Sequence, residues 1–365
     1  MRRRVLVIGA GVSGLTTASC LADAGFAVAV LADKSAELTP SVVAGALWEW
    51  PPAVCGHHTD LESLRRSKQW AVASYERFNA LAAQPMTGVR MAPAVFYFRH
   101  RIEDCPQERQ KMEAAAMHVH GFERSPDLID RHGVNRGFGL CDAYSYIAPQ
   151  IDTDVYMQWL RNDLVVAGCR FEQRRITQPL ADAEQSLCTE YNACAIVNCS
   201  GLGSVELAGD PMQPLRGALI RVRNDGITMP RITEAHCVAN DESVPHQNMI
   251  YIIPRGSDYL LLGGFAELGE WSLEIGLDNY KPIRDMLHRC QQFLPVLKSA
   301  VVDQQQPVRI GLRPHRGKNV RLERDPACRV VHNYGHGGSG FTFSWGCGAE
   351  AVKLVKSMLD IGAAP

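Results

Sequence analysis

The residues whose types and spacing point most directly to chemistry are a group of glycines near the N-terminus. Residues 9–14 read Gly-Ala-Gly-Val-Ser-Gly, which is the pattern G-x-G-x-x-G. In this pattern Gly9 permits a tight turn, Gly11 lets the backbone approach a pyrophosphate, and Gly14 lets a helix pack closely against a strand. A helix that begins here also presents amide donors and positive potential to phosphate groups. The pattern predicts a dinucleotide site formed by Gly9, Gly11, Val12, Ser13 and Gly14.

The segments around these glycines have the composition of a βαβ unit. Residues 4–8 form a short apolar run before the first glycine, which predicts a buried strand. Residues 13–24 have the apolar spacing of a helix, and residues 27–31 predict a second buried strand. Asp33 follows that strand, at a place where an acid can hold a ribose hydroxyl. FAD and NAD share this arrangement, so the segment alone does not choose between them.

A second glycine cluster, near the C-terminus, favours a flavin. Residues 333–342 contain four glycines, immediately before an apolar stretch at 343–358 that predicts the last helix. Such a loop lets backbone amides contact a ring system that faces the helix dipole. Because a reduced flavin carries negative charge near its N1 atom and C2 carbonyl, the start of a helix would stabilise it. The alternative, a solvent-exposed hinge, fits poorly with the apolar residues on both sides.

Hydrophobic periodicity predicts the other elements. Helices are expected around 61–81, 155–167 and 278–297, and strands at 169–176, 193–198, 217–222, 249–253, 259–264 and 329–333. Features of nucleotide binding occur at both ends and in the middle of the chain, so the nucleotide-binding domain is expected to be discontinuous in sequence.

A further pattern extends over most of the chain. Its segments are 33–48, 198–201, 251–254, 311–314 with 320–323, and 331–342 followed by 345–347. In order and rough spacing they resemble the D-amino acid oxidase family, whereas residues 56–140 match weakly. The resemblance implies an α/β fold with a discontinuous, Rossmann-type FAD domain and a second, α+β substrate domain built on an antiparallel sheet. We expect the FAD domain at 1–55, 160–205 and 306–365, and the substrate-binding and interface domain at 56–159 and 206–305.

The same resemblance implies a non-covalently bound FAD. Gly45, Ala46 and Leu47 would lie along the flavin, the backbone of Ile176 would hold the cofactor, and residues 338–342 would wrap the isoalloxazine ring. Beyond the N-terminal motif, the expected cofactor-binding residues are Asp33, Lys34, Gly45, Ala46, Leu47, Ile176, Ser200, Gly201, Arg313, Gly338, Ser339, Gly340, Phe341 and Thr342.

The family pattern makes Arg313 the residue that would bind a substrate carboxylate. A carboxylate in an apolar pocket loses its hydration, and a planar guanidinium restores two hydrogen bonds at a fixed angle. The alternative is a structural ion pair with an acid such as Glu323. Tyr251 would place its hydroxyl on the same carboxylate; the alternative is a tyrosine that only packs at a strand end. Arg313 and Tyr251 are the expected catalytic residues, and the substrate-binding set is Arg313, Tyr251, Ser339, Gln247 and Glu49.

Two residues depart from the family pattern. Gln247 occupies the position of a second tyrosine on an active-site lid, which puts the lid contact in doubt. Glu49 follows Trp48 where many members carry a neutral residue. If Glu49 faces the pocket it would favour a cationic side chain or hold the amine; the alternative is an ordinary surface acid.

The reaction implied by the resemblance is the oxidative deamination of a D-amino acid. The α-hydrogen would pass as a hydride to flavin N5, O2 would become H2O2, and the imine would hydrolyse to a 2-oxo acid. One alternative is an oxidase of another amine, such as glycine, an imino acid or a modified amino acid. Another is a flavin-holding protein without turnover, against which Arg313 and Tyr251 argue.

Composition bounds the partners. Thirty-eight basic and 39 acidic residues give a formal net charge of -1, so no global field would attract nucleic acid or an anionic membrane. The chain contains no apolar run of about 18 residues, so no membrane span is expected. Twelve scattered cysteines indicate a reducing, cytoplasmic compartment, and the histidines show no metal-ligand spacing. A homodimer is expected at most, with an amino acid and O2 as the small-molecule partners.

Overall fold

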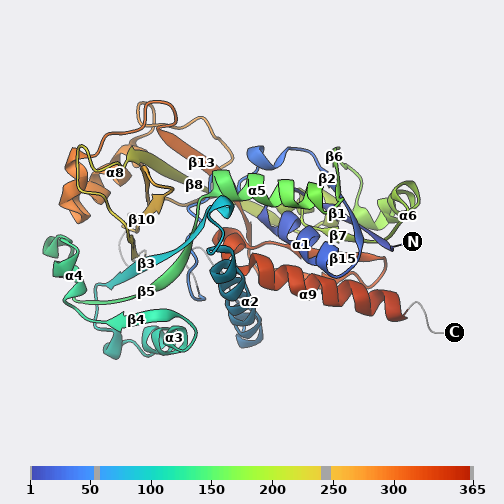
Figure 1. The fold of residues 1–365 in the computed structure, drawn as a ribbon, viewed down its shortest axis with the longest axis horizontal. Helices are drawn as coiled ribbons and strands as arrows, with labels where there is room; N and C mark the ends of the chain where they lie inside the picture. The colour runs from blue at the N-terminus through green and yellow to red at the C-terminus, as the bar shows by residue number, and fades with distance from the viewer. Residues whose placement is uncertain (1, 53–57, 240–247, 362–365) are drawn as a thin grey trace.

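The computed structural model describes residues 2–52, 58–239 and 248–361 of the 365-residue chain. Two lobes lie side by side, each built on a β-sheet (Figure 1). One sheet has six strands and the other has nine, and this mixture of two sheets with covering helices confirms the predicted α/β class.

The six-stranded sheet contains the predicted βαβ unit. In sheet order its strands are β14 (Arg321–Arg324), β15 (Val330–Tyr334), β7 (Ala193–Asn198), β1 (Arg4–Ile8), β2 (Ala27–Ala32) and β6 (Arg170–Gln173). Neighbouring strands are parallel except β14 and β15. Strand β1 is apolar along its length after Arg4 because both faces of a parallel sheet are covered and its side chains are buried on each face. Val5 and Val7 enter one core, whereas Leu6 and Ile8 enter another.

Helices cover both faces of this sheet. The core of Val5 and Val7 includes side chains from α1 (Val12–Asp23), α2 (Leu61–Leu81), α5 (Thr153–Val166) and α9 (Gly340–Ile361). The core of Leu6 and Ile8 includes side chains from α6 (Leu180–Tyr191). Helices α1 and α9 lie side by side along the lobe, so the two glycine-rich segments that precede them are brought together (Figure 1).

The nine-stranded sheet forms the second lobe and is almost entirely antiparallel. Its path is β12 (Glu267–Leu268), β8 (Met212–Arg223), β11 (Tyr259–Gly263), β10 (Ile250–Arg255), β9 (Ala235–Val238), β3 (Val89–Phe98), β5 (Asp142–Ile151) and β4 (His120–Arg124), and β13 (Val308–Arg316) pairs with β8. Only β3 and β9 pair in parallel among these strands. The remaining α-helices are α3 (Pro106–Ala116), α4 (Leu128–Arg131), α7 (Ser204–Ala208) and α8 (Lys281–Phe293).

The structure corrects some element boundaries. The last helix begins at Gly340, three residues before the predicted start, so Gly340, Phe341 and Thr342 form its first turn rather than a loop. Strands β3 and β5 were not predicted, because long parts of both are buried on both faces and lack the alternation of a half-exposed strand.

The expected domain ranges do not coincide everywhere with the elements of the two sheets. All six strands of the parallel sheet fall within 1–55, 160–205 and 306–365. However, β13 also falls within 306–365 and pairs with β8 in the other sheet. Helix α2 falls within 56–159, and it packs against α9. The domain division itself stays a prediction.

Candidate functional site

The turn after β1 has the geometry that the glycine motif predicts. Gly9 has a φ of +111°, and a Cβ there would collide with the carbonyl oxygen of Cys199. A Cβ at Gly14 would collide with the carbonyl oxygen of Gly9. A Cβ at Gly11 would meet only Ser41 Oγ, at 3.2 Å. The turn therefore requires glycine at positions 9 and 14, and the space beside Gly11 is open except for one hydroxyl.

The expected nucleotide-binding residues follow the carboxyl ends of the parallel strands. Gly9 follows β1, Asp33 and Lys34 follow β2, Ile176 lies just beyond β6, Ser200 and Gly201 lie just beyond β7, and residues 335–342 follow β15. Because carboxyl ends of parallel strands meet at one edge of a sheet, these residues gather along that edge, where open α/β sheets bind ligands. Asp33 is exposed there.

Buried polar atoms without partners mark the start of α9. Ser339 is 1% exposed, and its Oγ has no hydrogen-bond partner among the described residues. The Nε2 of the buried His336 is also without a partner in that part of the chain. Burial lowers the pKa of His336 to about 4, so the ring is neutral at neutral pH. Unsatisfied buried polar groups are costly, so these atoms fit a site that receives a polar ligand such as the flavin ring of FAD.

The segment 42–50 crosses the face of the second sheet. A Cβ added at Gly311 of β13 would meet Val43, and one added at Gly45 would lie 2.5 Å from Cε1 of Tyr251 in β10. Farther along, Trp50 N donates to the hydroxyl of Tyr146 in β5, at 3.4 Å. The segment expected to lie along the flavin thus packs on strands of the second sheet, with its glycine against the ring of Tyr251.

Two buried arginines hold the backbone of this segment. Nη2 of Arg255 donates to the carbonyl oxygens of Ala44 and Gly45, at 2.6 and 3.1 Å. Nη2 of Arg309 donates to the carbonyl oxygen of Val42 at 2.7 Å. Both arginines are 3% exposed. Burial lowers the pKa of Arg255 to about 10, which leaves it charged at neutral pH. Sequence reasoning did not find these roles, because an arginine that binds backbone carbonyls has no motif.

Replacing Arg255 with Met should weaken FAD binding about tenfold, because charge-assisted hydrogen bonds to two carbonyls are lost and the segment 42–45 relaxes. The dissociation constant is measured by titrating apoprotein with FAD and following quenching of flavin fluorescence. Arg231→Met is the matched control, since this half-exposed arginine also donates to a backbone carbonyl, that of Asp225.

A milder variant covers the case in which the Met variant does not fold. Thr153 accepts from Nη1 of Arg255 at 2.5 Å and donates to the carbonyl of Val42 at 2.5 Å. Thr153→Val removes both bonds and should move the dissociation constant in the same direction. FAD affinity equal to that of the parent protein in both variants would show that Arg255 does not act on the cofactor segment.

Arg313 has the surroundings of an anion-binding arginine. It lies on β13, opposite Leu215 of β8, and a Cβ added at Gly217 would collide with its guanidinium. Its Nη1 donates to the carbonyl oxygen of Phe265 at 3.4 Å. No carboxylate in the described part of the chain forms an ion pair with it, and Glu323 is paired with Arg321 at 2.7 Å instead. The alternative prediction, a structural ion pair between Arg313 and Glu323, is therefore wrong.

Gly217 is a site residue that sequence reasoning missed. A glycine inside a strand often marks a close approach of another group, and this one admits the Arg313 guanidinium against the face of the sheet. The signal was present, but the group that approaches Gly217 lies on a strand distant in sequence.

Tyr251 lies near Arg313 on the same face of the sheet. Burial is the main cause that raises the pKa of its hydroxyl well above the ordinary value; Cys237 and Glu49 raise the pKa further, and a hydrogen bond with the backbone of Leu47 and the charge of Arg313 lower it. The hydroxyl is therefore protonated at neutral pH and is able to donate to a carboxylate. Gly45 and Gly263 flank the residue, the first against its ring and the second as its strand partner.

Glu49 is buried, so the expectation of an ordinary surface acid is wrong. Its carboxylate is paired with Nζ of Lys111 in α3 at 3.1 Å, and the two side chains are 8% and 15% exposed. Lys111 is a second residue that sequence reasoning missed, because no pattern connects it with Glu49. Gln247 lies outside the described residues.

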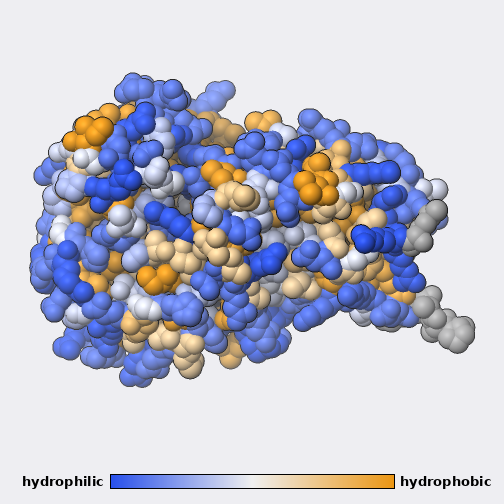
Figure 2. Space-filling view, in the orientation of Figure 1, coloured by the Kyte–Doolittle hydropathy of each residue, from blue (hydrophilic) through white to orange (hydrophobic). Residues whose placement is uncertain are grey.

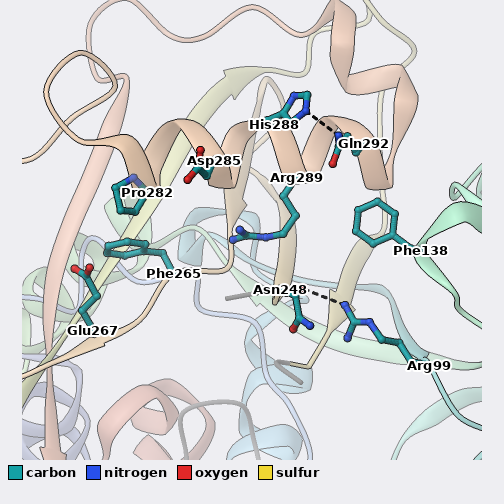
Figure 3. A pocket seen from close by; sticks show the side chains of 10 residues that line it. All are labelled: Arg99, Phe138, Asn248, Phe265, Glu267, Pro282, Asp285, His288, Arg289 and Gln292. Carbon is teal, nitrogen blue, oxygen red and sulfur yellow. Dashed lines mark hydrogen bonds between the residues drawn. The ribbon is translucent and has the colours of Figure 1, made fainter. Parts of the chain in front are cut away.

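A pocket of about 730 Å³ adjoins this region (Figure 3). Arg99 and Arg289 project into it, and both donate to backbone carbonyls, Arg99 to that of Asn248 and Arg289 to that of Met249. Phe265, whose carbonyl accepts from Arg313, also lines the pocket. The full lining is Arg99, Phe138, Asn248, Phe265, Glu267, Pro282, Asp285, His288, Arg289 and Gln292.

Comparison with known proteins identifies the family. The family described as FAD-dependent oxidoreductases matches residues 4–354. The chain belongs to this family. D-amino-acid oxidases from Rubrobacter xylanophilus and Streptomyces coelicolor are each 36% identical to it; the first alignment covers 98% of this chain and 97% of the relative, and the second covers 96% of each. Membership in this family confirms the prediction of FAD over NAD.

The fold has close counterparts among solved structures. Glycine oxidase from Bacillus cereus superposes with a TM-score of 0.73 at 18% sequence identity, over 98% of this chain and 96% of that chain. This likeness agrees with the expected fold class, and the family match over residues 4–354 includes strands of both sheets.

The surface, the helices and the metal-binding residue types can be examined for signs of a membrane or a metal ion as a further partner. The visible face mixes hydrophobic residues among hydrophilic ones (Figure 2). Within the described ranges, no helix is long and apolar enough to cross a membrane. The same ranges contain no group of three or more histidines, cysteines or acids that could hold a metal ion.

Proposed function

We propose that this protein is an FAD-dependent oxidase that oxidatively deaminates a D-amino acid. The observation that carries the proposal is the cation of Arg313, without a carboxylate partner in the described chain, seated on Gly217 and close to the protonated hydroxyl of Tyr251. A planar guanidinium and a phenol together match the carboxylate of an amino acid. This carboxylate site faces the segment expected to lie along the flavin, since Gly45 touches Tyr251.

Bound FAD supplies the hydride acceptor and passes the electrons to O2, which yields H2O2. The protein's contribution is orientation. Arg313 and Tyr251 hold the carboxylate, and Ser339 and Glu49 lie at other margins of the substrate. The cofactor would be held by the 9–14 turn, by Asp33, Lys34, Ile176, Ser200 and Gly201, by the segment Gly45, Ala46 and Leu47, and by Arg313 with Gly338, Ser339, Gly340, Phe341 and Thr342. A fixed alignment of the reacting carbon removes much of the entropic barrier.

The names of the relatives support this activity. Both 36% identical proteins are D-amino-acid oxidases, and they align over nearly their full length. The alternative substrate, another amine such as glycine or an imino acid, keeps the same flavin geometry. The glycine oxidase resembles this chain in fold, and at 18% identity that likeness does not extend to the substrate. A flavin-holding protein without turnover would not need an arginine that forms no ion pair with the described residues next to a buried tyrosine.

A peroxide-coupled screen of the purified holoprotein tests the proposal. D- and L-amino acids, glycine, sarcosine and cyclic imino acids are each supplied in air, and peroxide is measured. We expect D-amino acids to give peroxide. Turnover of glycine, sarcosine or an imino acid alone would move the assignment to the alternative, and no turnover with any of them would overturn both.

The cofactor is tested separately from the substrate. The purified protein should be yellow, and acid precipitation should release one FAD per chain into the supernatant, because the glycine-rich elements hold it without a covalent bond. Flavin that stays with the precipitate would contradict non-covalent binding. The absorbance ratio of flavin to protein gives the stoichiometry.

Three further expectations go with the proposal. The division into an FAD domain and a substrate domain, a cytoplasmic location and a homodimer are proposals at this stage. Light scattering of the purified holoprotein measures the oligomeric state. Fluorescence microscopy of the tagged chain in its own cell tests the location.

A further inference from the structure

The pairing of β10 with β11 ends at Tyr251. This residue is opposite Gly263, and the ladder continues from their pair in one direction only. In the other direction the two chains stay in contact without pairing, because a Cβ added at Gly264 would lie 2.0 Å from the carbonyl oxygen of Met249. Gly264 has a φ of +120°, a conformation that glycine adopts far more readily than other residues. The last pair of the ladder therefore contains a proposed carboxylate ligand.

One guanidinium holds both chains where this ladder ends. Nε of Arg289 in α8 donates to the carbonyl oxygen of Met249 at 3.1 Å, and its Nη2 donates to the carbonyl oxygen of Gly264 at 2.5 Å. Figure 3 shows this side chain projecting from α8 into the pocket. Backbone carbonyls that have left a ladder need other donors, and a charged donor makes the stronger hydrogen bonds.

Helix α8 gives this guanidinium a fixed base. Four of its side chains are buried in the core of the second lobe: Ile283, Met286, Cys290 and Phe293. Sγ of Cys290 also donates to the carbonyl oxygen of Gly263, at 3.5 Å. No carboxylate in the described ranges forms an ion pair with Arg289, and Asp285, one helical turn away, is paired with Lys281 at 2.6 Å. The hydrogen bonds of Arg289 are therefore directed to the two strand ends.

We propose that Arg289 is a positioning residue that holds Tyr251 and Arg313 in the arrangement that binds the substrate carboxylate. The inference rests on the proposed function, because it takes these two residues as the carboxylate ligands. Arg289 acts through the backbone of the two strand ends and not by contact with the substrate.

Each hydrogen bond of the clamp leads to one of the two ligands. Met249 is two residues before Tyr251, so a shift of its carbonyl would move the start of β10 and the ring of Tyr251 with it. Gly264 is followed by Phe265, whose carbonyl oxygen accepts from Nη1 of Arg313 at 3.4 Å. A shift of Gly264 would therefore move the acceptor that orients the guanidinium of Arg313.

Loss of the clamp should weaken carboxylate binding more than it slows the chemical step. Arg289→Met should raise KM for a D-amino acid about tenfold and change kcat less than about threefold, because carboxylate contacts are made both before and during hydride transfer. Steady-state peroxide assays of the holoenzyme give both constants. The 2-oxo acid of the same amino acid has the same carboxylate, so its dissociation constant should rise by a similar factor. Titration of the holoenzyme, followed by the flavin absorbance, measures that constant.

Arg284→Met is the matched control. Arg284 lies on the same helix and also donates to two backbone carbonyls, those of Leu277 and Asp278, at 2.8 and 3.1 Å. This variant should leave both KM and the 2-oxo acid dissociation constant unchanged. Arg289→Gln covers the case in which Arg289→Met does not fold, since glutamine keeps one neutral donor; it should raise both constants about threefold.

The outcomes separate this inference from the proposed function. Folded variants that lose thermal stability but keep the wild-type KM and 2-oxo acid affinity would show that Arg289 is a structural tie, and the inference would be wrong. An equal loss of FAD affinity would place the effect at the cofactor and would also overturn it. A wild type that neither oxidises a D-amino acid nor binds a 2-oxo acid would refute the proposed function, and the inference with it. We expect a higher KM and weaker 2-oxo acid binding, with FAD affinity and kcat nearly unchanged.

Discussion

Arg313→Lys should lower kcat/KM for a D-amino acid by one to two orders of magnitude. Lysine keeps the charge but loses the planar pair of donors, and charge-assisted hydrogen bonds of this kind contribute about 1.5–3 kcal/mol. Steady-state peroxide assays measure the effect. The FAD spectrum and the melting temperature should barely change, because Arg313 makes no ion pair with the described residues and donates one long hydrogen bond, to Phe265.

A second variant displaces the Arg313 guanidinium without replacing the arginine. Gly217→Ala should displace the guanidinium, since the added Cβ would collide with it, and kcat/KM should fall in the same direction. Arg136→Lys, at an exposed ion pair with Asp130, is the control for the arginine-to-lysine change itself. Kinetics of Arg313→Ala that equal those of the wild type would remove Arg313 from the site.

The D-enantiomer should react more than about a hundredfold faster than the L-enantiomer of the same amino acid. In the proposed site Arg313 and Tyr251 would fix the carboxylate, while Gly45 and the start of α9 would fix the flavin ring. With both ends held, one enantiomer points its α-hydrogen at the ring and its side chain into the site. The other must press its side chain against the ring or turn the hydrogen away, at a cost of about 3 kcal/mol or more.

Anaerobic stopped-flow spectroscopy measures this selectivity directly. Each enantiomer is mixed with the oxidised holoenzyme under nitrogen, and loss of the flavin absorbance is followed. Bleaching by L-amino acids and not by D-amino acids would reverse the assigned hand. The hand itself follows from the relatives, both of which are D-amino-acid oxidases, because the identity of the open flavin face is not written in any local pattern of residues.

The parts of the site that the sequence predicted are local in the chain. The 9–14 turn is one example, because its glycines serve backbone angles and contacts within the turn, such as the close approach of Gly14 to the carbonyl oxygen of Gly9. Strand β1 was predicted to its last residue, since burial on both faces makes it uniformly apolar. The glycine cluster before α9 was predicted for the same reason, although the helix begins earlier, at Gly340.

Only the tertiary structure decided how distant residues combine. Glu49 is isolated in the sequence, and it became a buried ion pair when α3 brought Lys111, 62 positions away, against it. Arg255 reaches Gly45 across 210 positions and holds the segment that is expected to lie along the flavin. Gly217 is explained only by Arg313, which lies on the neighbouring strand.

The physical reason is the range of each interaction. Backbone angles and hydrophobic periodicity act within a turn or a strand, so neighbouring residues record them. Ion pairs, backbone clamps and steric clearance require only that two groups meet in space, and many positions could supply either partner. The sequence by itself therefore determined the cofactor class and the parallel sheet, and the tertiary packing decided which charged side chains lie at the proposed site.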